Sequence, residues 1–392
     1  MNSAVPVGKQ PAVGDVIVQQ LTIIWEGLLA THPIDRDQNY FDLGGDSLTA
    51  VQMFAQIEKV FQAKLPVATL FDAPTIAELA EILKQETAKS RWPSLVAIQT
   101  KGTRPPFFCV HPHGGNVLVY RDLSRHLGID QPFFGLQSQG LDGTCEPLKR
   151  IEDMAAQYVW EIQRVQPRGP YFLGGYCLGG VVAYEMALQL LASGQEIGLL
   201  ALIDTLNASG SRPLNPWERV GHTTERLLFH ATNLFSLDAP NRKRFLLEKF
   251  RTIRTKLPVW WTGFLHKDPG GGVLGENNSE AQVLAQIWRA NEQSCIDYVP
   301  HPYPGLVTDV RPVRQYRCFD KPEFRWDRLS QGGVRTIVLP VNPPAIMVEP
   351  YVVHLAHALR QSIDDAARDS KCKHSYLPLD QTKSTTAASS RG

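Results

Sequence analysis

Short apolar runs alternate with segments of helical periodicity through the middle of this chain. Four runs, at 107–110, 132–137, 171–176 and 197–204, are each the length of one buried strand. Amphipathic segments separate them, which is the pattern of strands joined by crossover helices. The alternation predicts a mostly parallel sheet covered by helices, the α/β class. It resumes near the end of the chain with two strands and a last helix, at 307–317, 334–341 and 351–363.

A long segment, residues 206–296, interrupts this alternation. It contains helical patterns, the flexible sequence PGGG at 269–272 and four of the eight tryptophans of the chain. An insertion of this length beside a sheet is typical of a lid over a binding site. Part of the insertion is basic, since residues 241–256 hold seven Lys or Arg and one Glu, a balance of +6.

Three amphipathic helices are predicted ahead of the α/β pattern. Residues 15–30 place apolar side chains at steps of three and four, a second helix begins at Ser47, and Thr75 with Glu78 forms the capping pair of a third. Three helices in about seventy residues predict a small all-α bundle. Residues 15–84 hold ten acids and four Lys or Arg, a balance of −6, so the rest of the chain carries +7 to reach the total of +1.

The length of 392 residues favours more than one domain. We expect a disordered N-terminus at 1–14, the helical bundle at 15–85 and a charged, proline-containing linker at 86–93. The α/β domain is expected at 94–366, and the polar tail at 367–392 is expected to be disordered.

Composition excludes several classes of protein. The chain is 43% apolar and 20% charged, has no apolar run long enough to span a bilayer and does not begin like a signal peptide, so we expect a cytoplasmic protein without membrane contact. A net charge of +1 gives no case for nucleic-acid binding. Six cysteines without a C-x-x-C pair predict reduced thiols, with neither a disulfide framework nor a metal site.

Ser47 is the first candidate functional residue. It lies in LGGDSL, where Gly44 and Gly45 permit a tight turn before a helix. The free backbone N–H groups and the dipole at a helix N-terminus favour a phosphate there. The same serine could instead simply cap the helix, and local spacing leaves both interpretations open.

Cys177, in GGYCLGG, is the second. It follows a predicted strand and precedes a helix, the setting of a nucleophile elbow, although a buried cysteine in a glycine-rich turn is the alternative. Asp204 ends the next predicted strand, where its carboxylate could orient an imidazole. The backbone N–H groups of Leu178 and of His113, in the HPHGG turn, could form an oxyanion hole.

Both candidate sites lie in segments that resemble known domains. The run NYFDLGGDSLTAVQM, followed by LPVATLFDAPTIAELAEIL, resembles the carrier domains of non-ribosomal peptide and polyketide synthetases over residues 15–85. The runs FCVHPHGGNVLVYRDL, GGYCLGGVVAYEMA and LALIDT resemble the thioesterase domains that terminate such synthetases, from Ser94 to about Ala366. The second domain is thereby expected to have the α/β-hydrolase fold with a helical lid insertion.

The resemblance also implies a function. It implies that a phosphopantetheinyl transferase attaches 4′-phosphopantetheine to Ser47, and that an acyl or peptidyl thioester passes from there to Cys177. Release by hydrolysis or by intramolecular cyclisation would complete a step of peptide or polyketide biosynthesis. Since the chain has no adenylation, condensation or ketosynthase domain, upstream synthetase modules, in cis or in trans, are expected to load it.

One catalytic residue of the resembled family is missing. Its triad histidine lies in a pattern like V-P-G-x-H-x-x-M-x-x-E-P, and alignment on Glu349 and Pro350 puts Pro343 at that position. Proline has no side-chain nitrogen that could accept a proton. The imidazoles that could replace it are those of His113, His354 and His357.

Cysteine tolerates such a loss better than serine does. A free thiol has a pKa near 8.5, is partly ionised at neutral pH, and is expected to ionise more readily at a helix N-terminus. Transfer from one thiol to another exchanges one thioester for the next at little cost in free energy. Water would still need a base, so we expect slow hydrolysis and release by an internal or added nucleophile.

Two functions therefore remain open. The first is an enzyme that moves the acyl group from Ser47 to Cys177, as Cys177 and Asp204 favour. The second is a catalytically impaired thioesterase-like module that only binds and shields the chain, as Pro343 favours; a free-standing metabolite hydrolase would leave the carrier without purpose. The basic run at 241–256 is either a solvated face or a surface that receives the acidic carrier.

Overall fold

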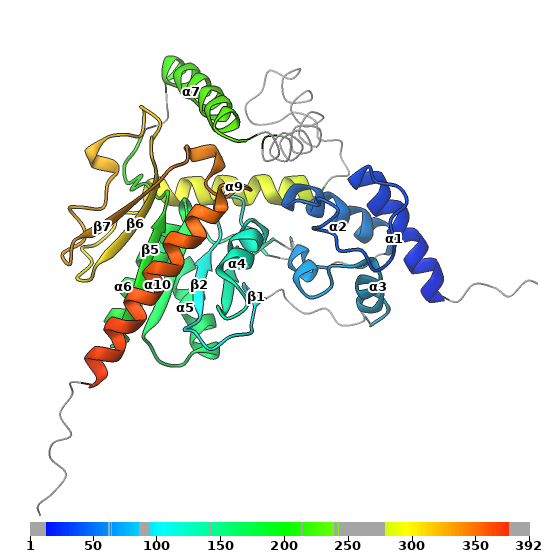
Figure 1. The fold of residues 1–392 in the computed structure, drawn as a ribbon, viewed down its shortest axis with the longest axis horizontal. Helices are drawn as coiled ribbons and strands as arrows, with labels where there is room; N and C mark the ends of the chain where they lie inside the picture. Colours follow the sequence, from blue (N-terminus) through cyan, green and yellow to red (C-terminus); the bar gives the residue numbers. More distant parts are fainter. Residues whose placement is uncertain are drawn as a thin grey trace, which may run out of the picture.

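The computed structural model describes residues 13–61, 63, 65–85, 94–141, 143, 145–212, 215–238, 242 and 279–375. Figure 1 shows a group of helices, coloured blue, beside a larger domain in which helices flank a sheet. The predicted linker at 86–93 lies outside the described residues, as do most of the two predicted tails.

The N-terminal domain is the helical bundle that the sequence predicts. Its α-helices are α1 (Val13–Leu29), α2 (Ser47–Phe61) and α3 (Ile76–Gln85), and the 3-10 helix η1 (Val67–Phe71) precedes α3. The predicted capping pair is present at α3. The backbone N–H of Glu78 donates to the Thr75 hydroxyl oxygen over 3.2 Å, and the Thr75 N–H donates to the Glu78 carboxylate over 3.1 Å.

Aromatic side chains form the centre of this bundle. Trp25 and Tyr40 are fully buried, and their rings meet edge to face with centroids 5.3 Å apart. Apolar side chains from all three α-helices, such as Leu21, Met53 and Leu79, surround them. The bundle therefore has a buried core of its own, to which Leu118 of the second domain also belongs.

Seven strands of the second domain form one sheet, in the order β1-β3-β2-β4-β5-β6-β7. Every neighbouring pair is parallel except β1 with β3, so the prediction of a mostly parallel sheet is confirmed. The strands are β1 (Leu95–Gln99), β2 (Phe107–Val110), β3 (Phe133–Leu136), β4 (Tyr171–Tyr176), β5 (Ile197–Ile203), β6 (Val307–Pro312) and β7 (Val334–Leu339).

Helices cover both faces of the sheet. Alternate residues of β2 show the two layers, because Phe107 belongs to the buried cluster that includes α4 and α10, whereas Phe108 belongs to the cluster that includes α5 and α6. Figure 1 shows α10, in orange and red, running across one face. The covering helices are η2 (Leu118–Tyr120), α4 (Arg121–Leu127), α5 (Ile151–Val165), α6 (Leu178–Ala192) and α10 (Val352–Ser375).

The segment predicted as a lid is described only in part. It contributes α7 (Pro216–Phe235), which begins with a reciprocal cap between Asn215 and Glu218, and α9 (Ser279–Asp297). The basic run at 241–256, apart from Arg242, lies outside the described residues. Two short 3-10 helices follow later in the chain, η3 (Pro322–Phe324) and η4 (Pro343–Ala345).

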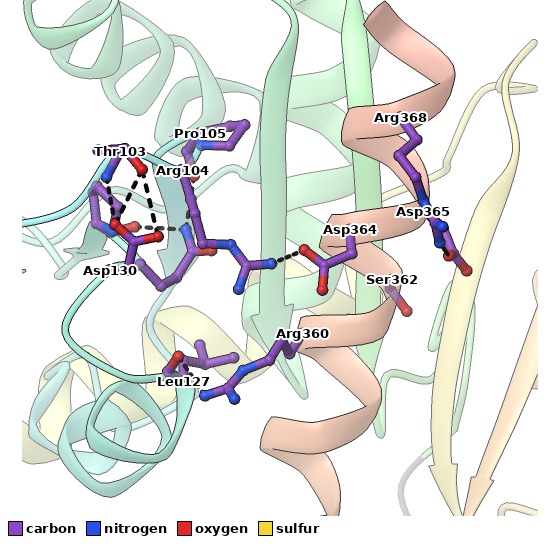
Figure 2. Close-up of polar contacts among 12 residues, drawn as sticks. Thr103, Arg104, Pro105, Leu127, Asp130, Arg360, Ser362, Asp364, Asp365 and Arg368 are labelled. Atoms are coloured by element: carbon purple, nitrogen blue, oxygen red, sulfur yellow. Dashed lines mark hydrogen bonds and ion pairs between the residues drawn. The ribbon is translucent and has the colours of Figure 1, made fainter. Parts of the chain in front are cut away.

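The last helix is longer than predicted, because α10 continues to Ser375, past the predicted helix end at 363. Its extension is tied to the rest of the domain by ion pairs. Figure 2 shows Arg104, in the loop before β2, paired with Asp364, and Asp365 pairs with Arg335 of β7 over 3.1 Å. Arg360, within the predicted part of the helix, donates to the backbone carbonyl of Leu127. These charged contacts give no periodic apolar signal, which is why the sequence placed the end too early.

The described residues also bear on membranes and metals. None of their helices has the length and apolar character needed to cross a bilayer. Within the same part of the chain, no group of three or more His, Cys, Asp or Glu residues is arranged to hold a metal ion. The cysteines described there are free thiols, at positions 109, 145, 177, 295 and 318.

Candidate functional site

Ser47 is the first residue of α2 and does not cap it. The cap is Asp46, whose carboxylate accepts hydrogen bonds from the backbone N–H and the hydroxyl of Thr49, each over 2.7 Å. The interpretation of Ser47 as a mere N-cap is therefore wrong. Its side chain is partly exposed at a helix N-terminus, where backbone N–H groups suit the phosphate of a serine phosphodiester.

The turn before Ser47 is held in place by Tyr40. The Tyr40 hydroxyl donates to the backbone carbonyl of Asp46 over 3.0 Å. Gly44 has a positive φ of 86°, and a side chain at Gly45 would overlap the Tyr40 ring. The two glycines that the sequence analysis singled out are thus required by the shape of this turn.

Cys177 lies between β4 and α6 with the backbone of a nucleophile elbow. Its φ of 57° and ψ of −117° are strained for a residue with a side chain. A methyl group at Gly175 would overlap the backbone of Gly179, and one at Gly179 would overlap the carbonyl oxygen of Val110. The sharp turn therefore needs glycine at these positions, and it turns the sulfur toward a cavity.

The Cys177 sulfur has a histidine partner. Its Sγ lies 3.3 Å from Nδ1 of His113, which comes from the turn after β2. The Nδ2 of Asn291, on α9, donates to the backbone carbonyl of His113 over 2.9 Å, and the Trp288 ring packs on the imidazole with centroids 5.6 Å apart. Helix α9 therefore fixes both the backbone and the ring of His113.

Burial keeps both partners neutral. Desolvation lowers the pKa of His113 to about 4 and raises the pKa of Cys177 to about 12. The nearby Asp204 carboxylate raises the thiol pKa as well, and the backbone N–H of Leu178 lowers it less than burial raises it. The expected increase in ionisation at the helix N-terminus is therefore outweighed by desolvation.

Asp204 pairs with an amide rather than an imidazole. Within the described part of the chain, its Oδ1 accepts a hydrogen bond from Nε2 of Gln315, in the loop after β6, over 2.8 Å. Burial raises the pKa of Asp204 to about 6. The expected Asp204–imidazole pair is absent among these residues.

Pro343, which aligns with the triad histidine of the resembled family, opens on the same cavity. Pro343 begins η4, and its ring lines a cavity of about 610 Å³ together with Cys177 and Asp204. His354 and His357 line a different hollow between β7 and α10, which separates them from the sulfur. Of the three replacements considered, the structure brings only His113 to Cys177.

The cavity around Cys177 is mixed in character. Its wall includes apolar side chains such as Val181 and Phe324, and the cationic side chain of Arg226 on α7. The imidazoles of His222 and His230, also on α7, line it as well. A cavity of this size, with apolar side chains between its polar groups, has room for an acyl chain.

Sequence reasoning missed four residues of this site: Trp288, Asn291, His222 and Gln315. All four reach it from segments after the elbow, and no motif marks them. Trp288 was singled out only as one of the tryptophans in the insertion. The one available signal was the helical period that places Trp288 and Asn291 three positions apart, on one face of α9.

The fold and the two candidate sites agree with two known protein families. Residues 19–83 match the phosphopantetheine attachment site family, and residues 105–251 match the thioesterase domain family. The chain is a carrier–thioesterase didomain, and its carrier domain is a phosphopantetheine-binding domain.

Several multidomain proteins contain similar sequences. A dimodular nonribosomal peptide synthase of Bacillus subtilis is 44% identical over 168 residues, which is 43% of this chain and 7% of that protein. Malpinin synthetase of Mortierella alpina is 42% identical over 184 residues, which is 46% of this chain and 2% of that protein. The present chain spans a small part of the length of either relative.

A solved structure contains the same arrangement of folds. A holo four-domain nonribosomal peptide synthetase bound to AMP and glycine aligns with a TM-score of 0.54 and 27% identity. The alignment covers 91% of this chain and 27% of that one. It therefore extends over both domains of the present chain.

Proposed function

We propose that this didomain takes an acyl or peptidyl group from phosphopantetheine on Ser47 onto the sulfur of Cys177, and then releases it, in nonribosomal peptide or polyketide biosynthesis. The observation that carries the proposal is the 3.3 Å contact between Cys177 Sγ and His113 Nδ1 beside a 610 Å³ cavity. It supplies a proton acceptor where Pro343 removes the expected one. The similarity to nonribosomal peptide synthetases supports the biosynthetic setting.

The first step requires little from the protein beyond proton transfer. Phosphopantetheine, when attached, supplies the acyl group as a thioester on a long arm. The Cys177 sulfur forms a bond to the thioester carbonyl carbon as its proton moves to Nδ1 of His113, which requires the tautomer protonated on Nε2. The backbone N–H of Leu178, at the start of α6, stabilises the oxyanion. When the oxyanion collapses, the bond to the leaving sulfur breaks and that sulfur takes the proton from His113.

Release repeats the same chemistry with another nucleophile. An amine, hydroxyl or water attacks the carbonyl carbon of the acyl group on Cys177 and gives its proton to His113, which returns the proton to the departing Cys177 sulfur. Asp204 is held by Gln315, so Asp204 does not assist the imidazole. A neutral amine within the acyl chain needs less assistance than water, and we infer that intramolecular release outpaces hydrolysis.

A second function, binding without turnover, is favoured by one specific observation. Burial raises the pKa of Cys177 to about 12, so the ground state holds a neutral thiol. If proton transfer to His113 did not accompany attack, the cavity would only shelter the acyl chain. The two functions differ in whether an acyl group ever becomes bonded to Cys177.

Peptide mass spectrometry separates them. The holo protein, loaded with a labelled acyl group, is quenched in acid at set times and digested, and the label is located on the Ser47 or the Cys177 peptide. We expect label to move to the Cys177 peptide, to remain on the carrier in Cys177→Ala, and to move about 100-fold more slowly in His113→Gln. Cys145→Ser, a thiol outside the cavity, is the matched control and should transfer normally. Label that never leaves the Ser47 peptide of the unsubstituted protein would establish the binding function instead.

A further inference from the structure

The carrier and thioesterase domains touch through a charged and aromatic contact. The guanidinium of Arg121, the first residue of α4, lies 4.0 Å from the centroid of the Phe41 ring. One of its nitrogens lies 3.6 Å from a carboxylate oxygen of Asp42. Burial lowers the pKa of Arg121, as expected for a cation that another surface covers. Phe41 and Asp42 belong to the carrier, and Arg121 belongs to the thioesterase domain.

Apolar side chains extend this contact in both directions. Leu118, in η2 of the thioesterase domain, is 6% exposed and belongs to the buried cluster of the carrier. Ala68, in η1 of the carrier, belongs to a buried cluster of the thioesterase domain, and Phe71 packs against both clusters. Around the Arg121 contact, each domain therefore packs an apolar side chain into the buried cluster of the other.

Each side of this contact belongs to a segment that leads to one of the two candidate sites. On the carrier, Phe41 precedes Ser47 by six positions, through the turn that Tyr40 holds. On the thioesterase domain, Arg121 follows Tyr120, whose fully buried hydroxyl accepts a hydrogen bond from the backbone N–H of Tyr176 over 3.1 Å.

Tyr176 immediately precedes Cys177. On the other side of η2, Leu118 follows His113 by five positions. Each half of the contact is thus close in sequence, or through one hydrogen bond, to one end of the proposed acyl transfer.

We propose that Arg121, with Phe41 and Asp42, forms the docking site that orients the carrier domain for acyl delivery to Cys177. This inference rests on the proposed function, since it assigns a role to the contact in that transfer. Sequence analysis offered the basic run at 241–256 for this purpose, and that run lies outside the described residues apart from Arg242. Among the described residues, Arg121 of α4 is a cation that meets the acidic carrier. A single arginine suits the task because it offers a charge to Asp42 and a flat cationic face to Phe41 at once.

Charge reversal in the full-length chain tests the docking site. Arg121→Glu is chosen because an acidic residue is well tolerated in the first turn of a helix, so α4 should still form. Asp42→Arg with Arg121→Glu restores opposite charges but not the cation over the ring. The matched controls are Arg168→Glu, an exposed arginine in the loop after α5, and Asp37→Arg, an exposed acid in the same carrier loop.

Two measurements are made on each variant. Small-angle X-ray scattering on the apo protein reports docking without any acyl group, and we expect the radius of gyration to rise in Arg121→Glu and to return toward the original value in the double variant. The rate of transfer from the loaded carrier to Cys177 should fall about tenfold in Arg121→Glu and partly recover in the double variant. In the unsubstituted protein this rate should fall as the salt concentration rises. Both control variants should behave like the unsubstituted protein.

A soluble cysteamine thioester separates this inference from the proposed function. It reaches Cys177 without the carrier, so its transfer rate should be the same in all variants. If it fails to acylate Cys177 in every variant, the proposed function falls, and the scattering data alone decide whether the domains dock through Arg121. Unchanged scattering and unchanged carrier-dependent transfer in Arg121→Glu would overturn the docking site. Equal slowing with carrier and soluble thioester would also overturn it, since that result places Arg121 in the chemistry.

Discussion

Alkylation of Cys177 by iodoacetamide is expected to be slow at neutral pH and to accelerate with every step toward alkaline pH. With a pKa of about 12, the thiol is ionised in roughly one molecule in ten thousand at pH 8. A free cysteine with a pKa near 8.5 is ionised in roughly a quarter of molecules at the same pH. The thiolate fraction of Cys177 should therefore be about 2,000-fold lower, and its alkylation rate should rise about tenfold per pH unit up to pH 10.

The histidine partner does not reverse this expectation. A thiolate–imidazolium pair forms in the resting state only if the imidazole holds a proton more tightly than the sulfur does. The pKa of His113 is lowered to about 4, far below that of Cys177, so the neutral pair dominates. His113 consequently accepts the proton only as the sulfur attacks a carbonyl carbon.

Peptide mass spectrometry at pH 6 to 10 measures this directly, with the Cys145 peptide as an internal reference for reagent and pH. His113→Gln should leave the alkylation profile of Cys177 within a few-fold of the unsubstituted protein, although acyl transfer slows strongly. The reasoning would be refuted by a rate that reaches a plateau near neutral pH with a midpoint below pH 7. That profile would mean that an ion pair, and not a neutral pair, occupies the elbow.

Three further outcomes are expected. Asp46→Ala removes the cap of α2 and should lower the free energy of unfolding of the carrier domain by about 1 kcal/mol, as measured by urea denaturation. It should also slow phosphopantetheine attachment at Ser47. An unchanged denaturation midpoint would contradict the capping role. Gly179→Ala forces a methyl group onto the Val110 carbonyl and should lower the free energy of unfolding by about 1–3 kcal/mol. It should also impair acyl transfer, whereas normal transfer would show that the elbow is not tight. Because the pKa of His113 is lowered on folding, the unfolded chain binds a proton at this residue first as the pH falls. The free energy of unfolding should therefore fall as pH drops from 6.5 toward 4, by up to about 1.4 kcal/mol per pH unit. In urea denaturation His113→Gln should lack this contribution to the pH dependence, and an identical slope in both proteins would contradict burial of a neutral imidazole.

The residues around Pro343, which aligns with the triad histidine of the resembled family, differ from those of an acid–imidazole pair. Gln315 donates a hydrogen bond to the Asp204 carboxylate, which could otherwise pair with an imidazole, and Pro343 lines the same cavity as Asp204 with an apolar ring. Helix α9 supports His113, because Asn291 donates to its backbone carbonyl. In the proposed transfer, the proton relay therefore consists of a thiol and a single imidazole.

The elements of the fold could be predicted because their signals are local. Apolar periods of two and 3.6 residues gave the strands and helices, and the Thr75–Glu78 pair marked the start of α3. Ser47 and Cys177 stood out because glycines around them permit turns that other residues cannot make. The end of α10 was placed too early, since ion pairs such as Arg104–Asp364 join residues far apart in the sequence.

The sequence by itself therefore determined two domains, their classes and the two residues proposed to carry an acyl group. Only the tertiary structure decided that His113 meets the sulfur, that Gln315 holds Asp204 and that Arg121 meets the carrier. Each of these pairs joins side chains from segments far apart in the chain, and such pairs leave no periodic pattern in either segment. Burial, which sets the pKa of Cys177 and of His113, likewise depends on everything packed around a group and cannot be deduced from its immediate neighbours in sequence.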